Sequence, residues 1–195
     1  MQSQLIQNAN TVCSALKELL ADDIEYLRTH PNPKYNWGNH SSNMSAKFNQ
    51  FDELTTLPVF DKLSAAGQQL DKIFLYYIKP MTTKILFNMD METKKLITTS
   101  ILIPIDYTPA SSYIWYNSDC LRPHHQMSDI PVLFKEYGLN MIARAQRFVV
   151  ETPMLVQNKN KLAGISNKDN PNQFVFLELT FKGNPTYDDV ASIFE

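Results

Sequence analysis

Two parts of the chain follow the same order of strand-like and helix-like stretches, and this order constrains the fold most. The segment Tyr35-x-Trp37 is echoed by Tyr113-x-Trp115, and each copy holds one of the two tryptophans. After each copy come a polar stretch, a helix that opens with "LPVF" or "IPVLF", and two further strand-like segments. A β-α-β-β unit with one helix cannot easily seal its own core, whereas two related units can.

The predicted fold class is therefore α+β, with duplicated βαββ units, an antiparallel sheet, helices packed on one side and an additional N-terminal helix. We expect an amphipathic helix over 1–30, a duplicated domain over 34–182, and a short C-terminal helix over 185–195. The repeats would span about 34–107 and 111–182. The alternative is that the echoed motif merely suits a half-buried strand, because residues two apart share one face.

Local patterns place the individual elements. Apolar residues recur every three or four positions from residue 3 to 29, which predicts one helix. A second helix is expected from about Leu57 toward Tyr76, where Pro80 would stop the chain from continuing. The remaining expectations are a hairpin of strands 84–90 and 96–105, a helix over 129–146, a strand over 148–157 broken at Pro153, a polar connection over 159–172, a strand over 173–181, and a helix capped by Thr186.

Composition excludes several classes of function. The 195 residues are 44% hydrophobic, which suffices for a sizeable core, and the net charge of -2 offers no basic surface for nucleic acid. The longest apolar run, residues 73–78, is far shorter than the roughly 20 residues that span a bilayer. The start of the sequence resembles no signal peptide, so we expect a cytoplasmic protein without membrane contact. Five glycines leave no glycine-rich phosphate loop.

The cysteines and histidines do not form a familiar metal pattern. Cys13 and Cys120 could form one disulfide, but a reducing cytosol favours two free thiols. His124 and His125 follow Cys120, and this spacing is not typical of zinc sites. His30 and His40 flank loops and are expected to be solvated. We therefore expect no metal and no cofactor.

Three stretches resemble the gyrase-inhibitor-like family, also called bacterial transcription-activator effector-binding domains, which is related in fold to SOUL haem-binding proteins. These stretches are "ILFNMDMETKKLITTSILIPI" (85–105), "SYIWYN" (112–117) and "NPNQFVFLELTF" (170–181). The resemblance implies a cleft between two repeats that binds small, flat or cationic molecules. By residue match, Glu178 is the cleft glutamate of the last strand, and Ser100 stands at its place in the first repeat.

Glu178 is the leading candidate for a binding residue. If Leu177 and Leu179 face the core, Glu178 faces the other side, which is either solvent or the wall of a pocket. A buried carboxylate needs a cationic ligand or a nearby donor. Aromatic side chains could line such a pocket or simply pack the sheet, and the candidates are Tyr35, Trp37, Tyr113 and Trp115.

The leading functional hypothesis is a small-molecule effector-binding domain, with an apolar or cationic ligand held between the two repeats. One alternative is an inhibitor or adaptor that docks a protein partner through its N-terminal helix. Another is a hydrolase that uses Glu178 as an acid or base. The lack of a convincing catalytic set favours binding over catalysis.

Overall fold

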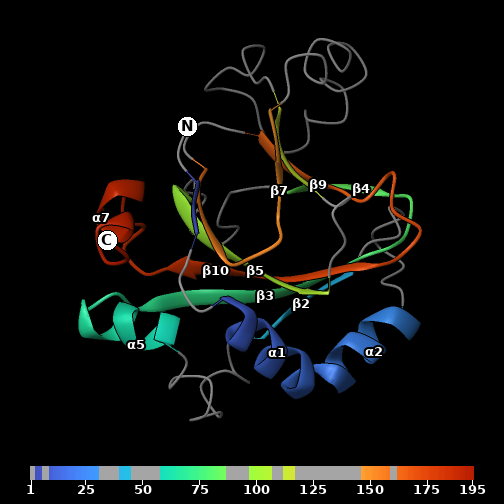
Figure 1. The fold of residues 1–195 in the computed structure, drawn as a ribbon, viewed down its shortest axis with the longest axis horizontal. Coiled ribbons are helices and arrows are strands. Elements are labelled where there is room, and N and C mark those ends of the chain that lie inside the picture. Colours follow the sequence, from blue (N-terminus) through green and yellow to red (C-terminus); the bar gives the residue numbers. More distant parts are fainter. Residues whose placement is uncertain are drawn as a thin grey trace.

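The computed structural model describes residues 3–5, 9–30, 40–44, 58–86, 97–106, 112–116, 146–158 and 162–195. These residues form a mixed α/β structure with two antiparallel sheets (Figure 1). The large sheet has six strands in the order β1-β8-β5-β10-β3-β2, and the small sheet has four in the order β4-β9-β6-β7. No described helix is long and apolar enough to cross a membrane.

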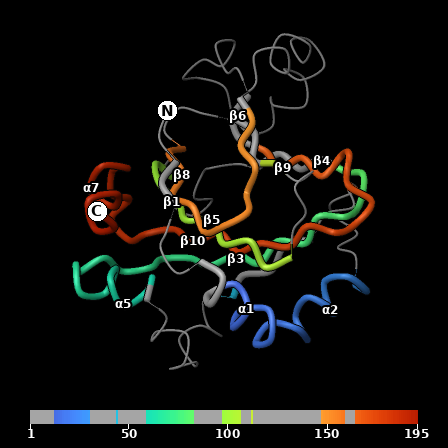
Figure 2. The backbone as a smooth tube through the Cα atoms, viewed as in Figure 1, coloured from blue at the N-terminus to red at the C-terminus, as the bar shows by residue number. Residues whose placement is uncertain are grey.

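The large sheet is built from segments that are far apart in the sequence. Its strands are β1 (Ser3–Leu5), β2 (His40–Asn43), β3 (Leu70–Ile78), β5 (Thr99–Asp106), β8 (Met154–Gln157) and β10 (Phe174–Phe181). The small sheet contains β4 (Thr83–Leu86), β6 (Ser112–Tyr116), β7 (Gln146–Val149) and β9 (Leu162–Ser166). From β3 onward, the chain passes from one sheet to the other at nearly every connection (Figure 2), which is the pattern of a double-sheet jelly roll.

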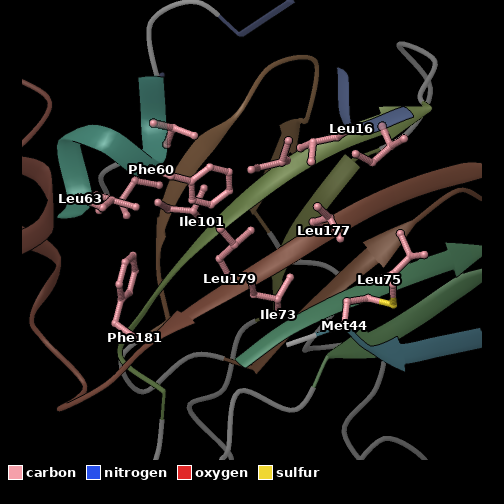
Figure 3. Packing of buried hydrophobic residues seen from close by; sticks show 14 of the residues in the cluster. Leu16, Met44, Phe60, Leu63, Ile73, Leu75, Ile101, Leu177, Leu179 and Phe181 are labelled. Atoms are coloured by element: carbon pink, nitrogen blue, oxygen red, sulfur yellow. The ribbon is translucent and has the colours of Figure 1, made fainter. Parts of the chain in front are cut away.

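Helices cover the outer face of the large sheet, on the side away from the small sheet (Figure 1). They are α1 (Ala9–Leu19), α2 (Ala21–Thr29) and α5 (Pro58–Ala65), while α7 (Tyr187–Ala191) follows β10. Leu16 of α1 and Phe60 and Leu63 of α5 pack against Ile101, Leu177 and other residues of β3, β5 and β10 (Figure 3). The apolar stripe of the N-terminal segment is thus part of the core. The prediction that it docks a protein partner is wrong for this reason.

Strand β10 is buried on both faces over its whole length. Its odd-numbered residues, such as Leu177 and Leu179, belong to the helix-side core, whereas Phe174 and Phe176 belong to a second cluster between the two sheets. This alternation follows from the two-residue period of a strand. It explains why the strand predicted at 173–181 reads as a continuous apolar run.

The prediction of a helix that runs from about Leu57 toward Tyr76 is wrong. Helix α5 ends at Ala65, and the chain turns at Gly67, whose φ is +74°. The Gly67 N–H donates to Ser64 O (2.9 Å) and the Gln68 N–H donates to Leu63 O (2.9 Å), which together form a Schellman motif. The following segment is β3, in which Ile73, Leu75 and Tyr77 are buried in the helix-side core while the alternate residues Phe74 and Tyr76 are partly exposed.

Two other expectations fail for reasons of topology. The described parts of 84–90 and 96–105 do not pair as a hairpin, since β4 pairs with β9 in the small sheet and β5 pairs with β10 and β8 in the large one. The polar connection expected over 159–172 contains β9, a central strand of the small sheet. Duplicated βαββ units are therefore not shown by the structure. The helix expected at 129–146 lies outside the described residues except for Gln146, which begins β7.

Two local predictions in the C-terminal part of the chain are confirmed, whereas the prediction for the N-terminal segment is not. The break at Pro153 is confirmed, because it separates β7 of the small sheet from β8 of the large sheet. Thr186 caps α7 as predicted: its side chain accepts from the Asp189 N–H, and the Asp189 carboxylate accepts from the Thr186 N–H. The N-terminal helix is divided at Leu20 into α1 and α2, and residues 3–5 are strand β1, contrary to the prediction of one helix.

Buried asparagines join the two turns that link the sheets. The Asn167 side-chain amide donates to Lys79 O (3.0 Å) in the β3–β4 turn and to Asn172 O (2.8 Å) in the β9–β10 turn. Its carbonyl oxygen accepts from the Asn170 amide (2.7 Å), and its N–H donates to Thr82 O (2.8 Å). Both Asn167 and Asn170 are fully buried. Asn167 therefore holds the crossings into and out of the small sheet in one register.

Replacing Asn167 tests this role. We expect Asn167→Ala to lower the free energy of unfolding by roughly 2–4 kcal/mol, because it leaves buried carbonyl and amide groups without partners. Asn172→Ala is the matched control, since Asn172 takes part through its backbone and is exposed. Urea unfolding should show a change within about 0.5 kcal/mol for the control. Equal stability of the two variants would contradict the role of Asn167.

Candidate functional site

The inner face of the large sheet packs against the small sheet through an apolar cluster, which we call the inter-sheet cluster. Most of its members are fully buried, and they come from both sheets and the segments that join them. Its buried residues are Ile78, Leu102, Val150, Met154, Val156, Ile165, Phe174 and Phe176, with Tyr76 and Phe148 partly buried beside them.

A chain of polar side chains lies on the same inner face. The Asn158 amide donates to Ser100 Oγ (2.8 Å), and the Ser100 hydroxyl donates to Glu178 Oε1 (3.1 Å). Asn158 and Ser100 are essentially inaccessible, and Glu178 is only 4% exposed. Glu178 and Ser100 come from the adjacent strands β10 and β5, so the sheet itself sets their separation. We call these three residues the Glu178 chain.

The position of Glu178 follows from strand geometry. Leu177 and Leu179 belong to the helix-side core, so Glu178 points to the opposite face, as the sequence indicated. Its low exposure rules out the solvent-facing alternative. A carboxylate in this place is costly unless hydrogen bonds or an opposite charge compensate its lost hydration. The Ser100 hydroxyl provides one such hydrogen bond.

Aromatic rings extend from the Glu178 chain along β10 and β3. Phe174 and Phe176 stack with ring centroids 5.2 Å apart, and Phe176 stacks on Tyr76 at 4.8 Å with an interplanar angle of 9°. Tyr76 in turn contacts Phe74 at 6.2 Å. Phe74 is the register partner of Glu178. We call these four rings the aromatic ladder, and the carboxylate lies at its Phe74 end.

The aromatic residues predicted for the site are not those of the ladder. Tyr35 and Trp37 lie outside the described residues. Tyr113 and Trp115 belong to β6 of the small sheet, where Tyr113 is in register with Ile165 and Phe148 and Trp115 with Ala163 and Gln146. The structure therefore tests neither the contacts nor the role of these four residues.

Sequence reasoning missed the ladder and Asn158. A two-residue period along β10 places Phe174, Phe176 and Glu178 on one face, and that signal was available. The partners on β3 were hidden because this segment was assigned to a helix. Asn158 has no signal of its own, since only the pairing of β8 with β5 brings it to Ser100.

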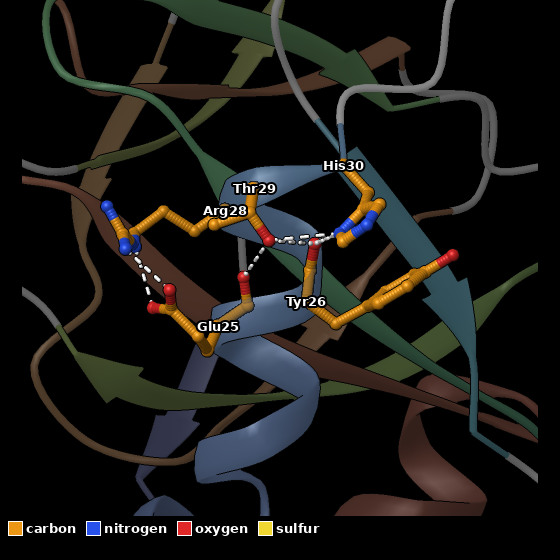
Figure 4. Close-up of polar contacts among 5 residues, drawn as sticks. All are labelled: Glu25, Tyr26, Arg28, Thr29 and His30. Atoms are coloured by element: carbon orange, nitrogen blue, oxygen red, sulfur yellow. Dashed lines mark hydrogen bonds and ion pairs between the residues drawn. The ribbon is translucent and has the colours of Figure 1, made fainter.

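His30 lies far from this face of the sheet. It follows α2 on the helix layer, where its ring stacks on the exposed Tyr26 at 4.3 Å and its Nδ1 lies 3.0 Å from Thr29 Oγ1 (Figure 4). Arg28 pairs with Glu25 on the same turn (Nε to Oε2, 2.7 Å). In the described part of the chain, no group of three His, Cys, Asp or Glu side chains is placed to hold a metal ion. His124 and His125 lie outside it.

No protein-family model and no curated protein matches the sequence. Solved structures do match the fold. SnoK, a non-heme alpha-ketoglutarate-dependent carbocyclase of nogalamycin biosynthesis, aligns with a TM-score of 0.57 and 10% identity over 92% of this chain and 78% of its own. A Pseudomonas putida prolyl-4-hydroxylase aligns with a TM-score of 0.51 and 8% identity, over 92% of this chain and 90% of its own. EctD from S. alaskensis, in a structure with 2-oxoglutarate and 5-hydroxyectoine, aligns with a TM-score of 0.52 and 10% identity, over 92% of this chain and 71% of its own.

These likenesses establish a shared fold, and they overturn the resemblance to gyrase-inhibitor-like domains. The effector-binding interpretation fails with it, because it required a cleft between two repeats. The alternatives of an adaptor and of a hydrolase gain no support either. The preference for a non-enzymatic role is also contradicted, since the fold neighbours are named as enzymes.

A non-haem iron centre is typically held by two histidines and one carboxylate. The described residues do not fit such a centre, because His30 lies on the helix layer and Glu178 is hydrogen-bonded to Ser100. The sequence has four histidines. A centre of this type would therefore need two of His40, His124 and His125, whose side chains are outside the described set.

The coupling between Ser100 and Glu178 can be measured directly. We expect Ser100→Ala and Glu178→Gln to be non-additive, with a coupling energy of about 1–2 kcal/mol, because the two groups share one buried hydrogen bond. Urea unfolding of both single variants and the double variant gives this value. Pairing Ser100→Ala with Glu18→Gln, on the exposed side of α1, should be additive within about 0.5 kcal/mol. An additive Ser100 and Glu178 pair would contradict the buried contact.

Cys13 on α1 carries a free thiol, and burial raises its pKa to about 11. In a Cys120→Ser variant, we expect labelling by iodoacetamide at pH 8 to be about 100-fold slower in the folded than in the unfolded protein, because the thiolate is the nucleophile. The stabilisation from the protonated thiol is complete below the unfolded pKa near 9.0 and is lost as pH rises toward 11. Equal labelling rates in the folded and unfolded states would contradict the burial of the Cys13 thiol.

Proposed function

We propose that this protein is an enzyme of the 2-oxoglutarate-dependent oxygenase type, whose reaction takes place between the two sheets. The observation that carries the proposal is the two-sheet fold, which aligns over nine-tenths of the chain with SnoK and with EctD. The names of these neighbours state dependence on alpha-ketoglutarate or a complex with 2-oxoglutarate. Their identities to this chain are low, so the support comes from architecture rather than from shared residues.

The side chains on the inner face of the large sheet support the proposal that the reaction takes place between the two sheets. Small-molecule sites are mostly apolar, with a few placed polar groups that orient the ligand. The inter-sheet cluster supplies the apolar surface, and the Glu178 chain supplies a carboxylate, a hydroxyl and an amide on one side of it. The helix-side core has no comparable polar chain among the described residues.

The chemistry that a bound metal and 2-oxoglutarate would add is oxidation of a substrate by dioxygen. The residues described here would contribute an apolar, water-excluding surface beside the reacting groups. Ile78, Leu102 and Phe176 exclude water from it, while the turns held by Asn167 keep the two sheets in register. Exclusion of water strengthens every electrostatic contact made there.

Binding of the co-substrate tests the proposal without knowledge of the primary substrate. Ni²⁺ can replace iron without supporting turnover, so we expect millimolar Ni²⁺ with 2-oxoglutarate to raise the melting temperature. At 100 times the dissociation constant the rise should be about 5–10 °C. Ni²⁺ alone should give a smaller rise. The measurement is thermal unfolding followed by circular dichroism.

Histidine variants locate the metal. His30→Ala is the matched control and should leave the Ni²⁺-dependent rise unchanged, because this side chain lies on the helix layer. Replacing any two of His40, His124 and His125 removes at least one of two metal ligands, so the rise should be lost in all three double variants. No rise in the wild type at saturating concentrations of both compounds would overturn the proposed function.

A further inference from the structure

We draw no further inference here: the strongest candidate, the exposed surface patch that the stacked rings of Tyr26 and His30 form at the end of α2, lies apart from the site already described, and nothing in the structure shows what covers it.

Discussion

The pairing of β10 with β3 on one side and β5 on the other is the interaction on which the rest of the structure depends. This strand is buried on both faces, so one set of its side chains closes the helix-side core and the other set closes the space between the sheets. Leu177 and Leu179 hold α1 and α5 in place, while Phe176 and Glu178 face the small sheet. A change of register by one residue would exchange these two sets and would bury the carboxylate among the helices.

Glu178 is the exception in this strand, and its surroundings show what its burial requires. An apolar residue would stabilise the inner face more simply, because replacing a buried charge by a hydrophobic side chain is often neutral or favourable. The protein instead places Ser100 on the adjoining strand β5, where its hydroxyl donates to the carboxylate, and Asn158, directly after β8, donates to Ser100. Such an arrangement trades stability for a polar group in a fixed position, which is common where a protein binds or transforms a ligand.

Local signals in the sequence were read correctly where they were short and self-contained. The strand at β10, the break at Pro153 and the Thr186 cap depend on residues within one turn or one strand, and the structure has all three. The orientation of Glu178 also followed from two leucines beside it. These features need no knowledge of which segment pairs with which.

The errors arose where pairing between distant segments decides the outcome. Segment 70–78 fits a helix or a strand by its apolar residues alone, and only its position between β10 and β2 makes it a strand. Strands β4 and β5 are close in sequence but belong to different sheets, so their similarity to a hairpin was misleading. The partnership of Ser100 with Glu178 was interpreted as a correspondence between repeats, whereas the two residues touch each other in one sheet.

Under the proposed function, the buried carboxyl group of Glu178 also limits where a dianionic co-substrate such as 2-oxoglutarate would bind. Like charges in a poorly solvated interior repel each other far more strongly than in water. Along β10, Phe174 and Glu178 are four residues apart, which corresponds to about 13 Å in a strand. Under the proposed function, the carboxylates of 2-oxoglutarate would therefore lie away from the Phe74 end of the ladder, because Glu178 occupies that end.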